Sequence, residues 1–156
     1  PSNGGGTATS ASARLNSPNG VQCTVTYVYV LDTANRKIRR VVIDTGDVTN
    51  VVSNIDFQSM LMAVSPDESK LYTASYSTGK VSVVDISAGT YTNIAVDGTS
   101  LTFSAPYGIT ISPDGTYLFV IETLSTYNTQ IRRVATSNYA DDVLLGFVDS
   151  NGFVAL

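Results

Sequence analysis

The sequence predicts an all-β protein that contains three copies of one four-stranded unit. Pro18-Asn19-Gly20 returns 88 residues later as Pro106-Tyr107-Gly108, and Ser65-Pro66-Asp67 returns after 47 residues as Ser112-Pro113-Asp114. Because 88 is twice 44, the repeat has a period of 44 to 47 residues, which is typical of four short strands. Val, Tyr, Thr and Ile abound, and these residues favour strands. No long stretch has apolar residues at helical spacing.

Each repeat has the same expected order of elements. A short apolar strand begins near Gly20, Met60 or Gly108. In the second and third repeats a Pro-Asp turn follows, in which Pro fixes φ and Asp bonds its own backbone. Second strands are expected at 27–32, 71–75 and 117–122, and third strands at 37–43, 80–86 and 129–135. A further turn then leads to an outer strand.

The repeats divide the chain into three blade-sized segments. The expected boundaries are 13–55 for the first blade, 56–99 for the second and 100–149 for the third. Residues 1–12 are expected to be a linker or the end of a preceding blade, and residues 150–156 the start of a further one.

Four-stranded repeats of this length are typical of the blades of a β-propeller, in which about four to eight blades surround a channel. Three blades alone would leave two apolar blade faces uncovered. We therefore expect about three blades of a larger, six-bladed ring. The expected partner at the open blade flanks is protein, either the rest of the same chain or another copy of it.

The first repeat resembles the NHL repeat. Tyr29–Val41 contains a strand that ends in Asp, a Thr-x-Asn turn and then an Ile-Arg-Arg segment, close to the family's Ile-Arg-Lys. Arg36 stands where the family's namesake His often occurs. The later repeats resemble the looser Ser-Pro-Asp-Gly form of YVTN-type and lactonase-like propellers. The resemblance covers residues 6–149 and implies a propeller, but propellers perform many functions.

The composition excludes several kinds of site from these residues. The chain contains no His, the commonest general base at neutral pH and a common zinc ligand, so neither a Ser-His-Asp triad nor a His-dependent propeller lyase is expected. A net charge of −4 without a broad basic stripe argues against nucleic-acid binding. No apolar run approaches the ~18 residues of a membrane-spanning helix.

Two further features concern the environment of the protein. The 18 Ser and 19 Thr, with only three Lys, favour an extracellular or cell-surface location. Cys23 is the only cysteine. We expect it to be a small buried hydrophobe at a strand end, or else to pair with a cysteine outside this sequence.

Asp32 and Glu122 are the candidate metal ligands. They occupy equivalent repeat positions at the end of the second strand, where the middle repeat has Ser75. One interpretation is that they cap the strand and bond the following turn. The other is calcium, which needs only oxygen ligands; the lactonase-like resemblance implies such an ion in the channel. No other cofactor is expected.

Tyr76, Tyr107 and Tyr127 are the candidate binding residues. We expect them in loops at blade ends, where ligands reach a propeller, although tyrosines also pack between blades. A protein or a carbohydrate would suit such side chains.

The leading hypothesis is a non-enzymatic structural or protein-binding scaffold of an extracellular or cell-surface protein, such as a glycosylated subunit of a fibre or surface appendage. The alternatives are half of a calcium-dependent lactonase-like hydrolase, or a sugar-binding propeller.

Overall fold

A computed structural model of the chain describes residues 13–55, 59–96, 98–125 and 128–145. Within these ranges the strands form three four-stranded antiparallel sheets and one two-stranded hairpin. Each four-stranded sheet keeps its strands in sequence order, as in a meander. The all-β class and the three four-stranded units are therefore confirmed, and each sheet is called a blade below.

The strands fall close to the ranges that the repeats predict. Blade 1 consists of β1 (Pro18–Cys23), β2 (Tyr27–Asp32), β3 (Lys37–Val42) and β4 (Val48–Ser53), with a 3-10 turn, η1 (Thr33–Asn35), after β2. Blade 2 consists of β5 (Ser59–Val64), β6 (Lys70–Ser75), β7 (Lys80–Asp85) and β8 (Thr90–Asn93). Blade 3 consists of β11 (Pro106–Ile111), β12 (Tyr117–Ser125), β13 (Asn128–Ala135) and β14 (Asp141–Leu145).

A short hairpin connects blades 2 and 3. It pairs β9 (Ala95–Val96) with β10 (Thr99–Ser100), where the sequence indicates only a connection. The backbone N–H of Phe103 then donates to the carbonyl oxygen of Gly79 at 2.8 Å. These bonds hold the segment that leads into blade 3 against blade 2.

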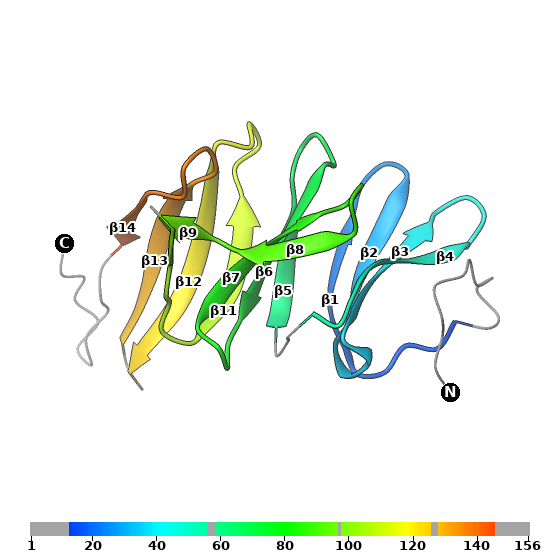
Figure 1. Cartoon of the computed structure of the whole chain (residues 1–156), viewed down its shortest axis with the longest axis horizontal. Helices are drawn as coiled ribbons and strands as arrows, with labels where there is room; N and C mark the ends of the chain where they lie inside the picture. Colours follow the sequence, from blue (N-terminus) through cyan, green and yellow to red (C-terminus); the bar gives the residue numbers. More distant parts are fainter. Residues whose placement is uncertain (1–12, 56–58, 97, 126–127, 146–156) are drawn as a thin grey trace.

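The three blades stand side by side in sequence order, with blade 2 in the middle (Figure 1). The first strands approach one another most closely, because β5 contacts both β1 and β11. First strands have this arrangement around the channel of a propeller.

Two apolar clusters fill the spaces between neighbouring blades. The cluster between blades 1 and 2 contains Tyr29, Leu31, Ile38, Val51, Val52, Ile55, Met62, Leu71 and Val84. The cluster between blades 2 and 3 contains Tyr72, Ala74, Val81, Ile94, Phe103, Ile109, Leu118, Val120 and Val134. Because strand side chains alternate between faces, blade 2 contributes Leu71 to the first cluster and Tyr72 to the second.

The predicted Ser-Pro-Asp turns connect the first two strands of blades 2 and 3. Asp114 Oδ1 accepts hydrogen bonds from Ser112 Oγ at 2.6 Å and from the backbone N–H of Thr116 at 3.0 Å. These bonds lower the pKa of the Asp114 carboxyl group from 3.8 to about 2. Asp67 makes the equivalent bonds to Ser65 and Ser69 and has the same shift. The side chain of this Asp therefore links the residues on both sides of the turn.

The Asp114→Asn variant tests this turn. The amide oxygen can still accept the two hydrogen bonds, but the charge is lost. Because the folded-state pKa is below the unfolded value, the carboxylate stabilises the fold above about pH 4, and this contribution disappears as the pH falls through about 2. Urea unfolding should show a wild-type advantage that is constant from pH 7 to pH 4 and shrinks below pH 4. An advantage that grows on acidification would contradict the assignment.

Gly79 should tolerate substitution worse than Gly98. Both have a positive φ, of 65° and 78°, but a Cβ on Gly79 would lie 2.5 Å from the carbonyl oxygen of Phe103, whereas a Cβ on Gly98 meets nothing within 4 Å. Gly98→Ala should cost about 1–2 kcal/mol for the left-handed backbone alone. Gly79→Ala should cost a further ~1–3 kcal/mol for the overlap. Chemical denaturation measures both losses of stability. Equal losses would show that the segment around Phe103 can move away from Gly79 without a measurable cost.

Candidate functional site

The register of the sheets confirms that Asp32, Ser75 and Glu122 are equivalent. Asp32 lies opposite Pro18 and Lys37, and Glu122 lies opposite Pro106 and Gln130. Ser75 lies opposite Ser59 and Lys80. By the same register, Arg39 in β3 corresponds to Ser82 in β7 and Arg132 in β13.

Asp32 is fully buried and binds three donor groups. It accepts hydrogen bonds from the backbone N–H of Asn16 at 2.7 Å, from Asn35 Nδ2 at 2.9 Å and from Arg39 Nε at 2.8 Å. Asn35 Nδ2 also lies 2.9 Å from the second carboxylate oxygen. Arg39 continues the network by donating to Asn50 Oδ1 at 2.8 Å. The carboxylate thus joins the segment before β1, the turn after β2, and β3.

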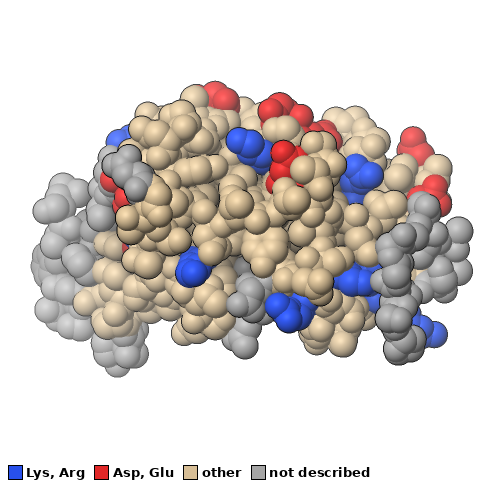
Figure 2. All heavy atoms as spheres, in the orientation of Figure 1, with Lys and Arg blue, Asp and Glu red and all other residues tan. Residues whose placement is uncertain are grey.

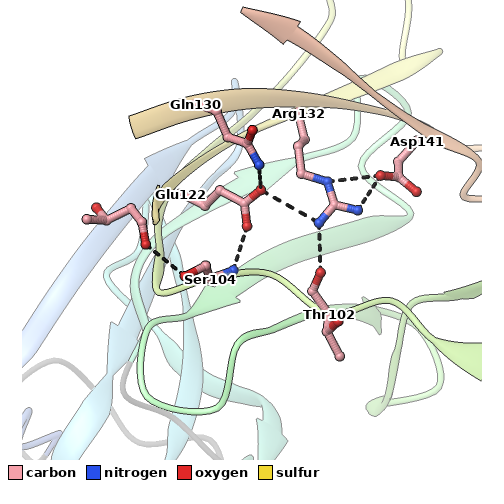
Figure 3. Close-up of polar contacts among 7 residues, drawn as sticks. Thr102, Ser104, Glu122, Gln130, Arg132 and Asp141 are labelled. Atoms are coloured by element: carbon pink, nitrogen blue, oxygen red, sulfur yellow. Dashed lines mark hydrogen bonds and ion pairs between the residues drawn. The ribbon is translucent and has the colours of Figure 1, made fainter. Parts of the chain in front are cut away.

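Glu122 has the same function in blade 3 (Figure 3). Its Oε2 accepts from the backbone N–H of Ser104 at 2.5 Å, and its Oε1 accepts from Gln130 Nε2. Arg132 lies beside it, with Nη1 at 3.7 Å from Oε1 and 2.7 Å from the Thr102 carbonyl oxygen. Arg132 also pairs with Asp141 and stacks on the Phe103 ring at 4.3 Å.

Both carboxylates therefore fasten the segment that leads into the first strand of their own blade. The backbone donors are Asn16 and Ser104, each two residues before the Pro that begins the strand. Charge-assisted bonds of this kind are shorter and stronger than neutral ones. Asp32 also bonds Asn35 in the following turn, as one interpretation predicts, whereas Glu122 bonds Gln130 of the next strand instead.

Blade 2 replaces both charges of the pair. Ser75 stands for the carboxylate, and Ser82 stands for the arginine, with its Oγ donating to Asn93 Oδ1 at 3.0 Å. Ser75 Oγ is buried without a hydrogen-bond partner among the described residues. Removing one member of a buried ion pair leaves an uncompensated charge, which is strongly destabilising. The loss of both members in blade 2 avoids that cost.

The structure does not bring Asp32 and Glu122 together as ligands. They belong to different blades, and each is engaged by donors of its own blade. Across the parts of the chain that the structure describes, no group of three or more His, Cys, Asp or Glu side chains could hold a metal ion. Calcium at these carboxylates remains a prediction.

The candidate tyrosines differ in their positions. Tyr76 follows β6 directly and is half exposed, as expected for a loop. Tyr107 lies within β11 and is half-buried, so its placement in a loop was wrong: the strand already begins at Pro106, which pairs with Glu122. Tyr127 lies outside the described residues. Tyr76 and Tyr107 thus lie in neighbouring blades, at the end of each blade where Ser75 and Glu122 lie.

A shallow hollow of about 270 Å³ lies at the other end of blades 2 and 3. It is lined by the two Ser-Pro-Asp turns together with Lys70, Tyr72 and Thr136. Its two aspartates already accept hydrogen bonds within their own turns. A carbohydrate ligand there remains a prediction.

The outer face of blade 1 carries two exposed residues, Val21 and Cys23, at apolar positions of the repeat. We call the face that a blade turns toward the preceding blade its leading face, and the opposite one its trailing face. Residues directly opposite one another on neighbouring strands share a face, so the leading face of blade 1 carries Val21, Cys23, Val28, Val30 and Val41. Val21 is 62% exposed, whereas the equivalent Met62 and Ile109 are 1% and 7% exposed.

This face explains why Cys23 is not the buried hydrophobe that was one of its two expected states; pairing with a cysteine outside this sequence stays a prediction. The thiol is exposed, although the residue is at a strand end as expected. Its equivalents are Val64 and Ile111, which pack into the clusters between blades. Cys23 lacks the apolar neighbours that surround these equivalents, because no blade among the described residues covers the leading face of blade 1.

Comparison with known proteins shows the fold. Neither a family model nor a curated protein matches the chain. Among solved structures, Kuenenia stuttgartiensis hydrazine synthase matches over 84% of this chain with 25% identity and a TM-score of 0.69. Nidogen in complex with laminin matches over 83%, with 16% identity and a TM-score of 0.66. A catalytically inactive virginiamycin B lyase from Staphylococcus aureus with quinupristin matches over 88%, with 15% identity and a TM-score of 0.61.

These proteins are β-propellers, and the present chain spans only 36%, 50% and 54% of theirs. With its three four-stranded sheets, the chain therefore forms three blades of a β-propeller, a part of a larger ring. In the described ranges, no helix has the length and hydropathy to cross a membrane.

The contribution of the Asp32–Arg39 ion pair to stability can be tested by replacing both residues with serine, the residue that blade 2 has at both positions. Asp32→Ser alone should cost about 3–5 kcal/mol, because Arg39 is left buried and uncompensated. Asp32→Ser combined with Arg39→Ser should cost less than the sum of the two single changes by at least ~1 kcal/mol. Urea unfolding of the four proteins measures the coupling. Asp44→Ser, at an exposed turn, is the control and should stay within ~0.5 kcal/mol of wild type. Additive losses would contradict the pairing.

Proposed function

We propose that the chain is part of a non-enzymatic propeller scaffold of NHL type, outside the cell or at its surface, that binds protein through its uncovered blade faces. The observation that carries the proposal is the leading face of blade 1. It has the apolar residues of a blade-packing face, but Val21 is 62% exposed where the equivalents are buried. Exposed apolar patches of this kind mark sites of protein association.

The state of the carboxylates supports a structural role. Catalytic and metal-binding carboxylates need a free oxygen that faces the ligand. Asp32 and Glu122 are instead buried, bonded to backbone N–H groups and paired with arginines. Their chemistry is used to hold the lead-in segments of the blades.

The structural neighbours include a complex-forming protein, nidogen, and enzymes, so the fold alone does not decide between the two classes. The lyase neighbour is described as catalytically inactive after a His-to-Ala replacement, and the present chain has no His. This difference favours the scaffold.

The surface is compatible with an extracellular fibre or appendage. Charged side chains are sparse, the acidic ones lie mainly in the upper half of the view, and uncharged residues cover most of the described surface in Figure 2. Such a surface suits packing against other copies or against neighbouring proteins.

Calcium provides the test against a metal-dependent hydrolase. For a scaffold, 5 mM CaCl₂ or 5 mM EDTA should leave the midpoint of thermal unfolding unchanged, because no ligand binds the folded state preferentially. Glu122→Gln should lower the midpoint by the same amount in both solutions. A midpoint that EDTA lowers and calcium restores, together with calcium-dependent hydrolysis of lactones, would reject the proposal in favour of the hydrolase.

A further inference from the structure

The trailing face of blade 3 closely copies the trailing face of blade 1. Register places Tyr117, Phe119, Ile121, Ile131 and Arg133 on this face of blade 3. Their equivalents in blade 1 are Tyr27, Tyr29, Leu31, Ile38 and Arg40, which face blade 2. Each position keeps its kind of side chain: an aromatic pair, two branched aliphatic residues and an arginine.

The copy extends to the stacking of the arginine. Arg40 lies over the Tyr27 ring at 4.7 Å, and Arg133 lies over the Tyr117 ring at 5.1 Å. In blade 1, Tyr27 packs against the cluster that the leading face of blade 2 completes. Blade 2 has Lys70 and Val83 at these positions. The trailing face of blade 3 is therefore built like one that receives the leading face of another blade.

At three positions the leading face of blade 1 carries smaller side chains than at least one of the other two leading faces. It has Val21, Cys23 and Val28 where blade 2 has Met62, Val64 and Leu71. Blade 3 has Ile109, Ile111 and Leu118 at these positions. The trailing face of blade 3 carries larger side chains than that of blade 2, because Ile121 and Ile131 stand where blade 2 has Ala74 and Val81.

The faces that meet inside the chain include both sizes. Blade 2 presents the small Ala74 and Val81 to the leading face of blade 3, and blade 1 presents the larger Leu31 and Ile38 to the leading face of blade 2. The trailing face of blade 3, with Ile121 and Ile131, is of the second kind.

We propose that a second copy of this chain covers the open faces head to tail, so that the leading face of blade 1 in one copy packs on the trailing face of blade 3 in the other. This inference rests on the proposed function, in which the faces bind protein, and names the partner. If the contact repeats the relation between neighbouring blades, two such contacts join six blades into one ring, within the about four to eight blades of propellers.

Two variants, each with a charge on one face, test the polarity of the contact. Val21→Asp disables the leading face and Ile131→Asp disables the trailing face. Wild type at about 100 μM should have twice the monomer mass of 16.5 kDa by light scattering or sedimentation. Each variant alone should have a mass of 16.5 kDa, because docking would bury an unpaired carboxylate, which costs free energy. An equimolar mixture should regain the doubled mass, because it still contains one intact face of each kind.

Val25→Asp is the matched control. Val25 is 94% exposed, lies between β1 and β2 and belongs to neither face, so this variant should keep the doubled mass. Circular dichroism checks folding, and Tyr117→Asp, at a more exposed position on the same trailing face, replaces Ile131→Asp if the latter does not fold.

Cys23 reports which copy is covered, because its thiol lies on the leading face. In the mixture, only the copy that carries Ile131→Asp has its leading face docked, so maleimide labelling of that copy should slow by at least tenfold relative to the Val21→Asp copy. Intact-mass spectrometry separates the two. In wild type both copies should be protected.

Three results would overturn the proposal: wild type with a mass of 16.5 kDa at all concentrations, doubled mass in both single-face variants, or a mixture that stays monomeric. A monomeric wild type with no calcium effect would reject the second copy and leave the scaffold in place. Calcium-dependent hydrolysis would reject the proposed function itself.

Discussion

Each four-stranded blade has two apolar faces, and every other feature of the structure depends on how these faces are covered. Blade 2 is covered on both sides by its neighbours, through the clusters around Leu71 and Tyr72. Blades 1 and 3 each have one neighbour among the described residues. The same repeat position is therefore buried in one blade and exposed in another, as Met62 and Val21 are. Burial in this chain is a property of the array rather than of the single repeat.

The buried ion pairs add a second constraint, which acts within each blade. Asp32 with Arg39 and Glu122 with Arg132 hold the lead-in segment to the sheet, so that the first strand starts at a defined residue. In blade 1 both members are buried, so the loss of one alone would leave a buried charge without compensation, whereas in blade 3 Arg132 also pairs with Asp141. Blade 2 takes the neutral form, with Ser75 and Ser82 in place of the two charges.

Much of the fold follows from local signals in the sequence. Strand positions and the Ser-Pro-Asp turns were predictable, because Pro, Asp and alternating apolar residues act over a few residues. The equivalence of Asp32 and Glu122 was predictable from the period, but their partners were not, since Arg39 and Arg132 meet them only through the register of the sheet. Cys23 was misjudged because its burial depends on a neighbouring blade. Tyr107 was misjudged because β11 begins at Pro106, before the expected start near Gly108.

The two faces of a blade are different surfaces, and this gives the array a direction. A leading face carries the aliphatic residues of positions such as Met62 and Ile109, and a trailing face carries the aromatic residue of the Tyr29 position. In both contacts between neighbouring blades a leading face meets a trailing face, so the proposed contact between copies is head to tail. Contacts of this kind close into a ring when the rotation between blades divides a full turn, and otherwise continue as a filament. In the proposed assembly, the rotation between blades therefore decides whether a ring or a filament forms.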